Sequence, residues 1–235
     1  MKYKAHEYQE YATKFIEDNE ESAVFLECGL GKSVITLTAI KNLMARGKVN
    51  RVLVVAPLRV GKTTWPEEIG KWDHLAGLTY AVAIGNVAER LSALKAKADI
   101  TIINRENVEW LIDKSGVAFD YDMLVIDELS SFKSFKAKRF KALLKVRPNI
   151  TRIVGLTGTP SSNGLMDLWA EFRLLDLGER LGRYITRYRL AYFTPDKRNA
   201  QVVFSYKPLP GAEERIYDKI DDITISMSKG KGGAR

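Results

Sequence analysis

The sequence predicts an α/β fold, in which a mostly parallel sheet carries helices on both faces and is followed by a small, mainly helical, basic C-terminal extension. Runs of four or five apolar residues without alternation are typical of strands buried on both faces of a parallel sheet. Amphipathic stretches separate these runs, and this alternation indicates a wound sheet covered by helices. In the first such stretch, apolar residues recur every three or four positions from 34 to 44, and Gly47 stands where the helix would end. The apolar runs are residues 23–26, 52–56, 80–84, 100–103, 123–126 and 153–156.

The alternation ends near Gly178, and we therefore expect two regions. Residues 1–178 form the α/β domain, and residues 179–235 form an extension rich in arginine and tyrosine. Three prolines at 195, 208 and 210 interrupt the extension, because proline does not continue a helix. Residues 228–235 are rich in glycine and lysine, which is typical of a flexible tail.

Composition narrows the class of partner. The chain has 37 Lys and Arg residues against 29 Asp and Glu residues, and the net charge of +8 favours a polyanion such as nucleic acid. The single cysteine, Cys28, excludes an internal disulfide, and His6 and His74 lack zinc-ligand spacing. The N-terminus is polar, and no apolar run approaches the ~20 residues that span a bilayer. We therefore expect a cytoplasmic protein.

Two stretches could cradle phosphate groups. Residues 56–63 fit the strict phosphate-loop pattern, but they contain one glycine, and Pro57 removes an N–H from the turn. The Trp65-Pro66 pair then interrupts the helix that should begin there. Residues 27–33 contain two glycines between a predicted strand and a strongly predicted helix, and we prefer them.

Each residue type in this second stretch, the phosphate loop, has a role in binding a nucleotide. Gly29, Leu30 and Gly31 let the backbone wrap closely around phosphate oxygens at a helix N-terminus. Lys32 can reach the β- and γ-phosphates, and Ser33 can hold Mg²⁺. The alternative is a glycine-rich turn between a strand and a helix that binds nothing.

A pair of carboxylates, Asp127 and Glu128, ends the apolar run at 123–126. Open α/β sheets bind their ligands at the carboxyl ends of the strands. One carboxylate can hold Mg²⁺ while the other orients an attacking water. Such a pair alone is often only a solvated strand end, but together with the phosphate loop on a neighbouring strand it predicts phosphoryl-transfer chemistry.

These residues belong to an ordered series of motifs. The sequence resembles the first motor lobe of superfamily 2 helicases of the DEAD/DEAH-like type, and most closely their Swi/Snf-type branch. Asp127-Glu128-Leu129-Ser130 departs from the Asp-Glu-Gly-His or Asp-Glu-Ala-His of that branch, which leaves the role of the fourth position unassigned. The resemblance rests on Tyr8-Gln9, on residues 28–33, 55–58, 101–104 and 127–130, and above all on residues 156–169, whose Thr-Gly-Thr-Pro and Asp-Leu-Trp resemble motif III.

The resemblance covers roughly residues 6–178 and implies a RecA-like lobe that uses ATP and Mg²⁺. It implies that Gln9 reads adenine and that Thr157, Gly158 and Thr159 couple nucleotide state to the nucleic-acid surface. From the residues alone, this last stretch is a polar turn with a helix cap at position 163. Nothing after residue 180 resembles motifs IV to VI, so the resemblance also implies a second RecA-like lobe, in the same protein or a partner, that carries the arginine fingers.

Two basic clusters are candidates for contact with nucleic acid. Residues 131–150 contain no acidic residue, and helical spacing places three of their lysines, Lys138, Lys141 and Lys145, on one face. An ordinary solvated helix face explains this cluster equally well. In the extension, Arg183 and Arg187 alternate with tyrosines that could stack on bases, although we favour the tyrosines as the core of a helical protrusion.

The sequence therefore predicts the ATP-binding lobe of a nucleic-acid-dependent ATPase, a double-stranded DNA translocase or helicase with contacts to the DNA backbone. We expect weak turnover from this chain alone, because a transition-state arginine contributes about 10³–10⁵ in rate. A non-hydrolysing module that senses nucleotide or binds DNA is the alternative. A small-molecule kinase is disfavoured, because it would leave the basic excess and motif III unexplained.

Overall fold

The computed structural model describes residues 1–158, 164–199 and 201–228. Its centre is a sheet of seven parallel strands in the order β3-β4-β2-β5-β6-β1-β9. Each predicted apolar run lies in a strand or overlaps one, and five of these six strands are buried on both faces. The sixth, β3, lies at an edge of the sheet, with Tyr80 exposed and its other two residues half-buried. The strands are β1 (Glu21–Leu26), β2 (Val52–Ala56), β3 (Tyr80–Val82), β4 (Ile100–Asn104), β5 (Met123–Asp127), β6 (Arg152–Thr157) and β9 (Thr224–Met227).

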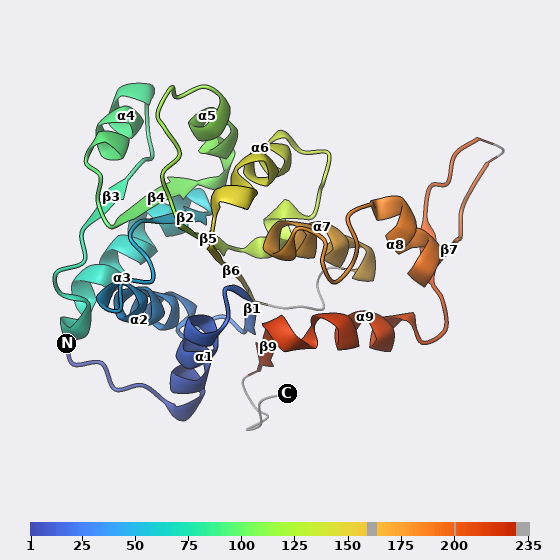
Figure 1. Cartoon of the computed structure of the whole chain (residues 1–235), viewed down its shortest axis with the longest axis horizontal. Coiled ribbons are helices and arrows are strands. Elements are labelled where there is room, and N and C mark those ends of the chain that lie inside the picture. Colours follow the sequence, from blue (N-terminus) through green and yellow to red (C-terminus); the bar gives the residue numbers. More distant parts are fainter. Residues whose placement is uncertain (159–163, 200, 229–235) are drawn as a thin grey trace.

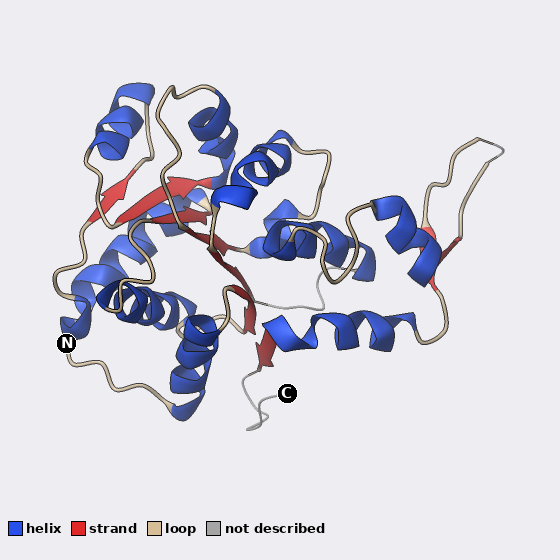
Figure 2. Cartoon of the chain, viewed as in Figure 1, coloured by secondary structure: helices blue, strands red, loops and turns tan. Residues whose placement is uncertain are grey.

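Helices cover both faces of the sheet, as the sequence predicts (Figures 1 and 2). Successive strand residues point to opposite faces, so Val24 packs in one apolar core and Phe25 in the other. The first core is closed by α1 (Glu7–Asp18), α2 (Lys32–Ala45) and α3 (Trp65–Lys71). The second is closed by α4 (Val87–Lys95), α5 (Val108–Asp113), α6 (Lys138–Val146), α7 (Leu165–Asp176), α8 (Ile185–Tyr192) and α9 (Ala212–Ile220).

The helix predicted after the first strand is α2, and it ends as its sequence indicates. Gly47 has a φ of +66°, the left-handed conformation in which glycine commonly follows a helix. Its N–H donates to the carbonyl of Met44 over 2.9 Å, which closes the last turn. Among the described helices, none is both long and apolar enough to cross a membrane.

The chain after residue 178 leaves the sheet and then returns to it. Helix α8 leads into a hairpin of β7 (Phe193–Pro195) and β8 (Tyr206–Pro208), and α9 runs back toward the sheet (Figure 1). Strand β9 then pairs in parallel with β1, from Ala23 opposite Thr224 to Leu26 opposite Met227. The extension therefore supplies one edge of the central sheet, which the sequence analysis did not predict. Residues 229–235 of the predicted flexible tail lie outside the described residues.

The half-buried Arg180 ties the returning segment to β1, and the buried Arg147 shares one of its partners. Arg180 forms ion pairs with Asp222 at 2.7 Å, Asp176 at 3.3 Å and Glu21 at 3.3 Å. The guanidinium of Arg147 pairs with the same Glu21 at 3.2 Å. Arg147 also donates to the carbonyl of Leu174 over 2.7 Å, at the end of α7. These contacts hold the extension in one orientation against the sheet.

Candidate nucleotide-binding site

The predicted nucleotide-binding residues meet at one cavity of about 620 Å³, at the carboxyl ends of β1 and β5. The strands that carry the phosphate loop and the carboxylate pair are not direct neighbours, contrary to the prediction. Strand β6 lies between them, so Thr157, its last residue, stands between the two motifs. Of the predicted residues, the cavity is lined by Gln9, Gly29, Gly31, Lys32, Ser33, Asp127 and Glu128, while Leu30 contacts Gln9.

The phosphate loop depends on its two glycines. Gly29 and Gly31 have φ values of +85° and +82°, a left-handed conformation that costs other residues about 1–2 kcal/mol. A Cβ on Gly31 would also lie 2.6 Å from Nε2 of Gln9. Helix α2 begins at Lys32, directly after Gly31. The first N–H groups of a helix have no carbonyl partner within it, and together with the helix dipole they form an anion site.

Lys32 and Ser33 lie on the first turn of α2, beside the cavity. The ammonium group of Lys32 donates to the carbonyl of Leu26 over 2.8 Å, across the base of the loop. Its positive charge also favours the ionised form of Asp127 and acts to lower the pKa of that carboxyl group. A lysine so placed can exchange one oxygen partner for phosphate without moving to another part of the cavity.

Asp127 is a carboxyl group held in a specific orientation. Burial raises its pKa above the usual value, and a hydrogen bond from Trp65 acts in the opposite direction. The indole Nε1 of Trp65 donates to Oδ2 of Asp127 over 2.8 Å. Trp65 is fully buried in the core, and it also positions a site residue. No sequence pattern marks Trp65 for this role, because the place of β2 beside β5 is set by the tertiary structure.

Glu128 is held by two hydroxyl groups. Its backbone has a φ of +65°, an uncommon conformation for a residue with a side chain, of the kind that recurs at functional sites. Oε1 of Glu128 accepts a 2.7 Å hydrogen bond from Ser130 and a 3.0 Å hydrogen bond from Thr157. Ser130 is the fourth position of this motif, one of the two at which the sequence departs from the Swi/Snf-type pattern. Its side chain therefore holds the carboxylate of the same motif.

Gln9 connects the N-terminal helix to the phosphate loop. Its Oε1 accepts a 3.0 Å hydrogen bond from the backbone N–H of His6, and its Nε2 donates to the carbonyl of Leu30 over 3.3 Å. The hydroxyl of Tyr8 donates to the same carbonyl over 3.2 Å. The ring of His6, at the N-cap of α1, stacks on Tyr8 with 5.6 Å between centroids. His6, Tyr8 and Gln9 therefore form one wall of the cavity.

The rival stretch, residues 56–63, folds as the start of a helical segment. Residues Val60–Thr64 form a π-helical turn that runs directly into α3. The N–H of Gly61 donates to the carbonyl of Pro57 over 2.9 Å, and Lys62 is exposed and does not line the cavity. The prediction that Trp65-Pro66 interrupts this helix was wrong, because the chain stays helical from residue 58 to Lys71, and the π-helical turn lies just before the proline, which has no N–H to donate.

Cys28 and Gly158 lie close to each other at the phosphate loop. Cys28, in the phosphate loop, is exposed, whereas burial is the commoner state of a free cysteine. A Cβ on Gly158 would lie 3.4 Å from Sγ of Cys28, so the residue after Thr157 faces the phosphate loop. Thr159, the third predicted coupling residue, lies outside the described residues together with 160–163.

The basic residues predicted to contact nucleic acid lie outside the cavity. Lys138, Lys141 and Lys145 are exposed along α6, and Lys145 pairs with Asp113 at 2.8 Å. Helices α6 and α8 both pack on the second core, on either side of α7 (Figure 1). Arg187 is exposed on α8, and Arg183 is exposed two positions before that helix. Tyr188 and Tyr192 of α8 are buried as favoured, while Tyr184 is exposed.

A wound parallel sheet with a glycine loop, Lys32, Asp127 and Glu128 at the carboxyl ends of its strands defines a RecA-like α/β domain with a phosphate loop. The chain belongs to the SNF2-related family, since residues 8–180 match the SNF2-related domain. The resemblance to the Swi/Snf-type branch is thereby confirmed.

Relatives and solved structures agree with this assignment. Protein p41 of Acyrthosiphon pisum secondary endosymbiont phage 1 is 37% identical over 94% of this chain and 49% of its own length. DNA excision repair protein ERCC-6-like of Mus musculus is 27% identical over 80% of this chain and 16% of its own length. The chain therefore spans half or less of these curated relatives. The Sulfolobus solfataricus SWI2/SNF2 ATPase core in complex with dsDNA shares the fold, with a TM-score of 0.79 and 22% identity over 98% of this chain and 46% of that one.

Proposed function

We propose that this chain is the ATP-binding motor lobe of a nucleic-acid-dependent ATPase that hydrolyses ATP with Mg²⁺ and moves along double-stranded DNA. The observation that supports this most directly is the convergence of Lys32, Asp127 and Glu128 on one cavity. Thr157, from the motif that resembles motif III, is hydrogen-bonded to Glu128 at the same place.

The chemistry follows from these positions. The N–H groups at the start of α2 and the ammonium of Lys32 bind the β- and γ-phosphates, for which Lys32 leaves the carbonyl of Leu26. Gln9 reads adenine from the adjoining wall. Glu128 orients the water that attacks the γ-phosphate, and its carboxylate is held for this by Ser130 and Thr157.

The donor set beside the phosphate loop suits Mg²⁺. The hydroxyl of Ser33 and the carboxylate of Asp127 are hard oxygen ligands of the type that Mg²⁺ prefers, and both line the cavity. When bound, Mg²⁺ neutralises charge on the phosphate oxygens. Trp65 holds Asp127 in one orientation, and Lys32 favours its ionised form.

The track and the second lobe are further parts of the proposal. The relative solved with double-stranded DNA supports a duplex track, and the exposed lysines of α6 suit sequence-independent contacts to phosphates. A second RecA-like lobe, in the same protein or a partner, supplies the arginine fingers, so this chain alone binds ATP and hydrolyses it slowly.

The test is steady-state ATP turnover and ATP binding by this chain, each without DNA, with single strands and with duplex. We expect Mg²⁺-dependent binding and a low turnover that duplex stimulates more than single strands do. Glu128→Gln should keep binding and lose turnover by about 10²-fold or more. Binding with no turnover under any condition would indicate the non-hydrolysing sensor instead, and phosphate transfer to a small metabolite would indicate a kinase.

A further inference from the structure

The hairpin formed by residues 193–208, here called the projecting hairpin, extends away from the sheet at one end of the molecule (Figure 1). Its hydrogen bonds continue beyond the two short strands toward the tip. The N–H of Asp196 donates to the carbonyl of Ser205 over 2.9 Å, and the N–H of Phe204 donates to the carbonyl of Lys197 over 2.7 Å. At the tip, Oδ1 of Asn199 accepts from the N–H of Val202 over 2.6 Å. The described residues of the projecting hairpin, 193–199 and 201–208, therefore pair in a defined register.

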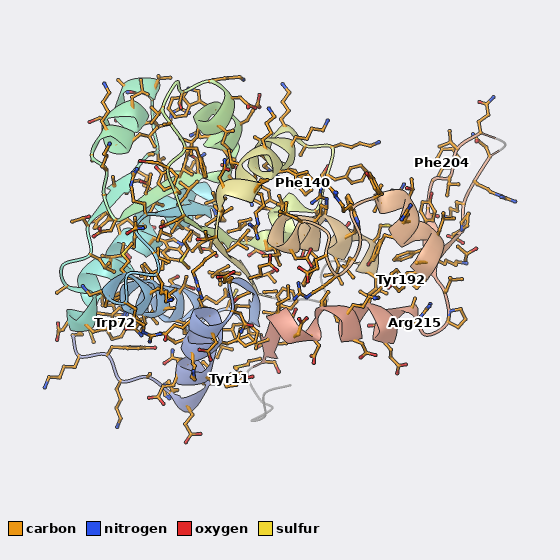
Figure 3. The ribbon with its side chains drawn as sticks, in the orientation of Figure 1. Tyr11, Trp72, Phe140, Tyr192, Phe204 and Arg215 are labelled. Carbon is orange, nitrogen blue, oxygen red and sulfur yellow. The ribbon has the colours of Figure 1, made fainter. Side chains whose placement is uncertain are left out.

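The base of the projecting hairpin is fixed to the rest of the fold. The guanidinium of Arg189 lies 4.9 Å from the ring centroid of Tyr206, and that of Arg215 lies 5.3 Å from the ring centroid of Tyr192. Figure 3 shows Tyr192 and Arg215 at this base and Phe204 farther out along one arm. The hydroxyl of Tyr188 donates to the carbonyl of Leu165 over 2.6 Å, so the base is joined to the first residue of α7.

The outer part of the projecting hairpin exposes apolar side chains. Phe204 is 67% exposed and Val202 is 52% exposed. Both lie on the arm that pairs antiparallel with the preceding arm at Arg198 and Val203, and the N–H of Phe204 donates to the carbonyl of Lys197, so Phe204 and Lys197 are neighbours across the projecting hairpin. An exposed aromatic ring beside a cation forms a contact surface that suits a flat, anionic partner.

The charge of the residues in and before the projecting hairpin indicates the chemistry of that partner. Between residues 183 and 207 the sequence has six arginine or lysine residues and one acidic residue, Asp196. Asp196 is already neutralised by Lys207 at 2.8 Å, and its Oδ2 accepts from the hydroxyl of Ser205 over 3.0 Å. An uncompensated positive field around an exposed aromatic side chain suits nucleic acid, whose phosphates bind cations and whose bases stack on rings.

We propose that the projecting hairpin is a second nucleic-acid contact, in which Lys197 and Arg198 bind backbone phosphates and Phe204 stacks on a base where duplex opens into single strand. Apolar side chains held on a rigid element are used in this way to separate or cap base steps. The proposal rests on the proposed function, because it assumes that the chain engages DNA. It adds a contact to a base beside the duplex, from residues that the sequence alone did not mark as a site.

The experiment compares binding of this chain to two labelled DNAs, a blunt duplex and a fork with 2-aminopurine at its junction. We expect the wild-type chain to bind the fork more tightly and to change 2-aminopurine fluorescence. Phe204→Ala should bind the fork at least about fivefold more weakly and lose the fluorescence change, while Phe204→Trp retains both. Lys197→Ala combined with Arg198→Ala should reduce the slope of log affinity against log salt by about 2.

A matched charge control is Lys95→Ala combined with Lys97→Ala, at exposed positions at the end of α4. This control should leave the slope of log DNA affinity against log salt unchanged. Fork affinity and fluorescence in Phe204→Ala equal to wild type would overturn the hairpin proposal alone, provided that the wild-type chain binds duplex. Failure of the wild-type chain to bind either DNA would overturn the proposed function as well. Unchanged melting temperatures establish that the variants are folded, since these side chains are exposed.

Discussion

The hydroxyl of Thr157, the last residue of β6, donates a 3.0 Å hydrogen bond to Oε1 of Glu128, which follows the neighbouring strand β5. The residue proposed to orient water and the first of the proposed coupling residues are thus in direct contact. Any rearrangement of Glu128 around bound nucleotide must change this bond. The segment that follows Thr157 leads to α7 and, through Tyr188, to the base of the projecting hairpin.

This contact gives the first prediction. Thr157→Val keeps the shape of a buried side chain but removes the donor, so it should lower the free energy of unfolding by roughly 0.5–1.5 kcal/mol. It should also lower duplex-stimulated turnover by about tenfold or more while ATP binding is kept, because Glu128 loses one of its two hydroxyl partners. Thr157→Ser, which keeps the donor, is the matched control. Equal turnover in the two variants would show that the hydrogen bond has no functional role.

The second prediction distinguishes the two candidate phosphate loops. Lys32→Ala should weaken ATP binding by about 30-fold or more, because it removes a charged donor to the phosphates. Lys62→Ala is the control, since Lys62 is an exposed lysine in the rival stretch and lies outside the cavity. Titration with a fluorescent ATP analogue measures both. If Lys62→Ala were the variant that lost affinity, the assignment of the loop would be wrong.

The third prediction concerns Glu171, a buried residue of α7. Burial, and next the negative charges of Asp167 and Glu128, raise the pKa of this carboxyl group to about 8. The folded chain therefore holds a proton that the unfolded chain releases at its ordinary pKa near 4.5, and stability from this group falls as pH rises from about 4.5 to about 8.

Glu171→Gln keeps the size of the side chain and cannot ionise. Its free energy of unfolding should exceed that of wild type at pH 8, by an amount on the order of 1 to a few kcal/mol, and the difference should disappear toward pH 4.5. Urea unfolding at several pH values measures this. A parallel pH dependence in the two proteins would show that Glu171 ionises normally in the folded chain.

The fourth prediction concerns the basic face of α6. Replacing Lys138, Lys141 and Lys145 together by alanine should weaken duplex binding and reduce the slope of log affinity against log salt by up to about 3. Lys145 already pairs with Asp113, so the expected reduction is closer to 2 if that pair persists on DNA. The Lys95 and Lys97 double alanine variant serves as the control here too. An unchanged slope in the triple variant would assign α6 to an ordinary solvated surface.

The fold was predictable where the local pattern is unambiguous. Five strands are buried between two helical layers, so each forms a continuous apolar run in the sequence. The edge strand β3 is less buried but also begins an apolar run. Strand β9 has four residues at an edge of the sheet, with Ser226 exposed and Ile225 buried, and so short a pattern does not distinguish a strand from a loop. Its place beside β1 depends on contacts such as the ion pair between Arg180 and Asp222.

The candidate site also contains residues that the local sequence predicts and residues that it does not. Gly29, Gly31 and Lys32 were predictable because loop conformation and helix start depend on adjacent residues. Trp65 donates to Asp127 across 62 positions of the chain, and no local pattern marks it as more than a core residue.

By itself, the sequence determined the α/β class, the phosphate loop, the carboxylate pair and the family, because each depends on a pattern of residues close together along the chain. Only the tertiary structure decided that β6 separates the phosphate loop from the carboxylates and that Thr157 thereby reaches Glu128. It also decided that the basic extension supplies an edge strand of the sheet and carries the projecting hairpin. The physical reason is that strand order and register bring together groups distant in sequence, and the packing of the whole sheet sets that register.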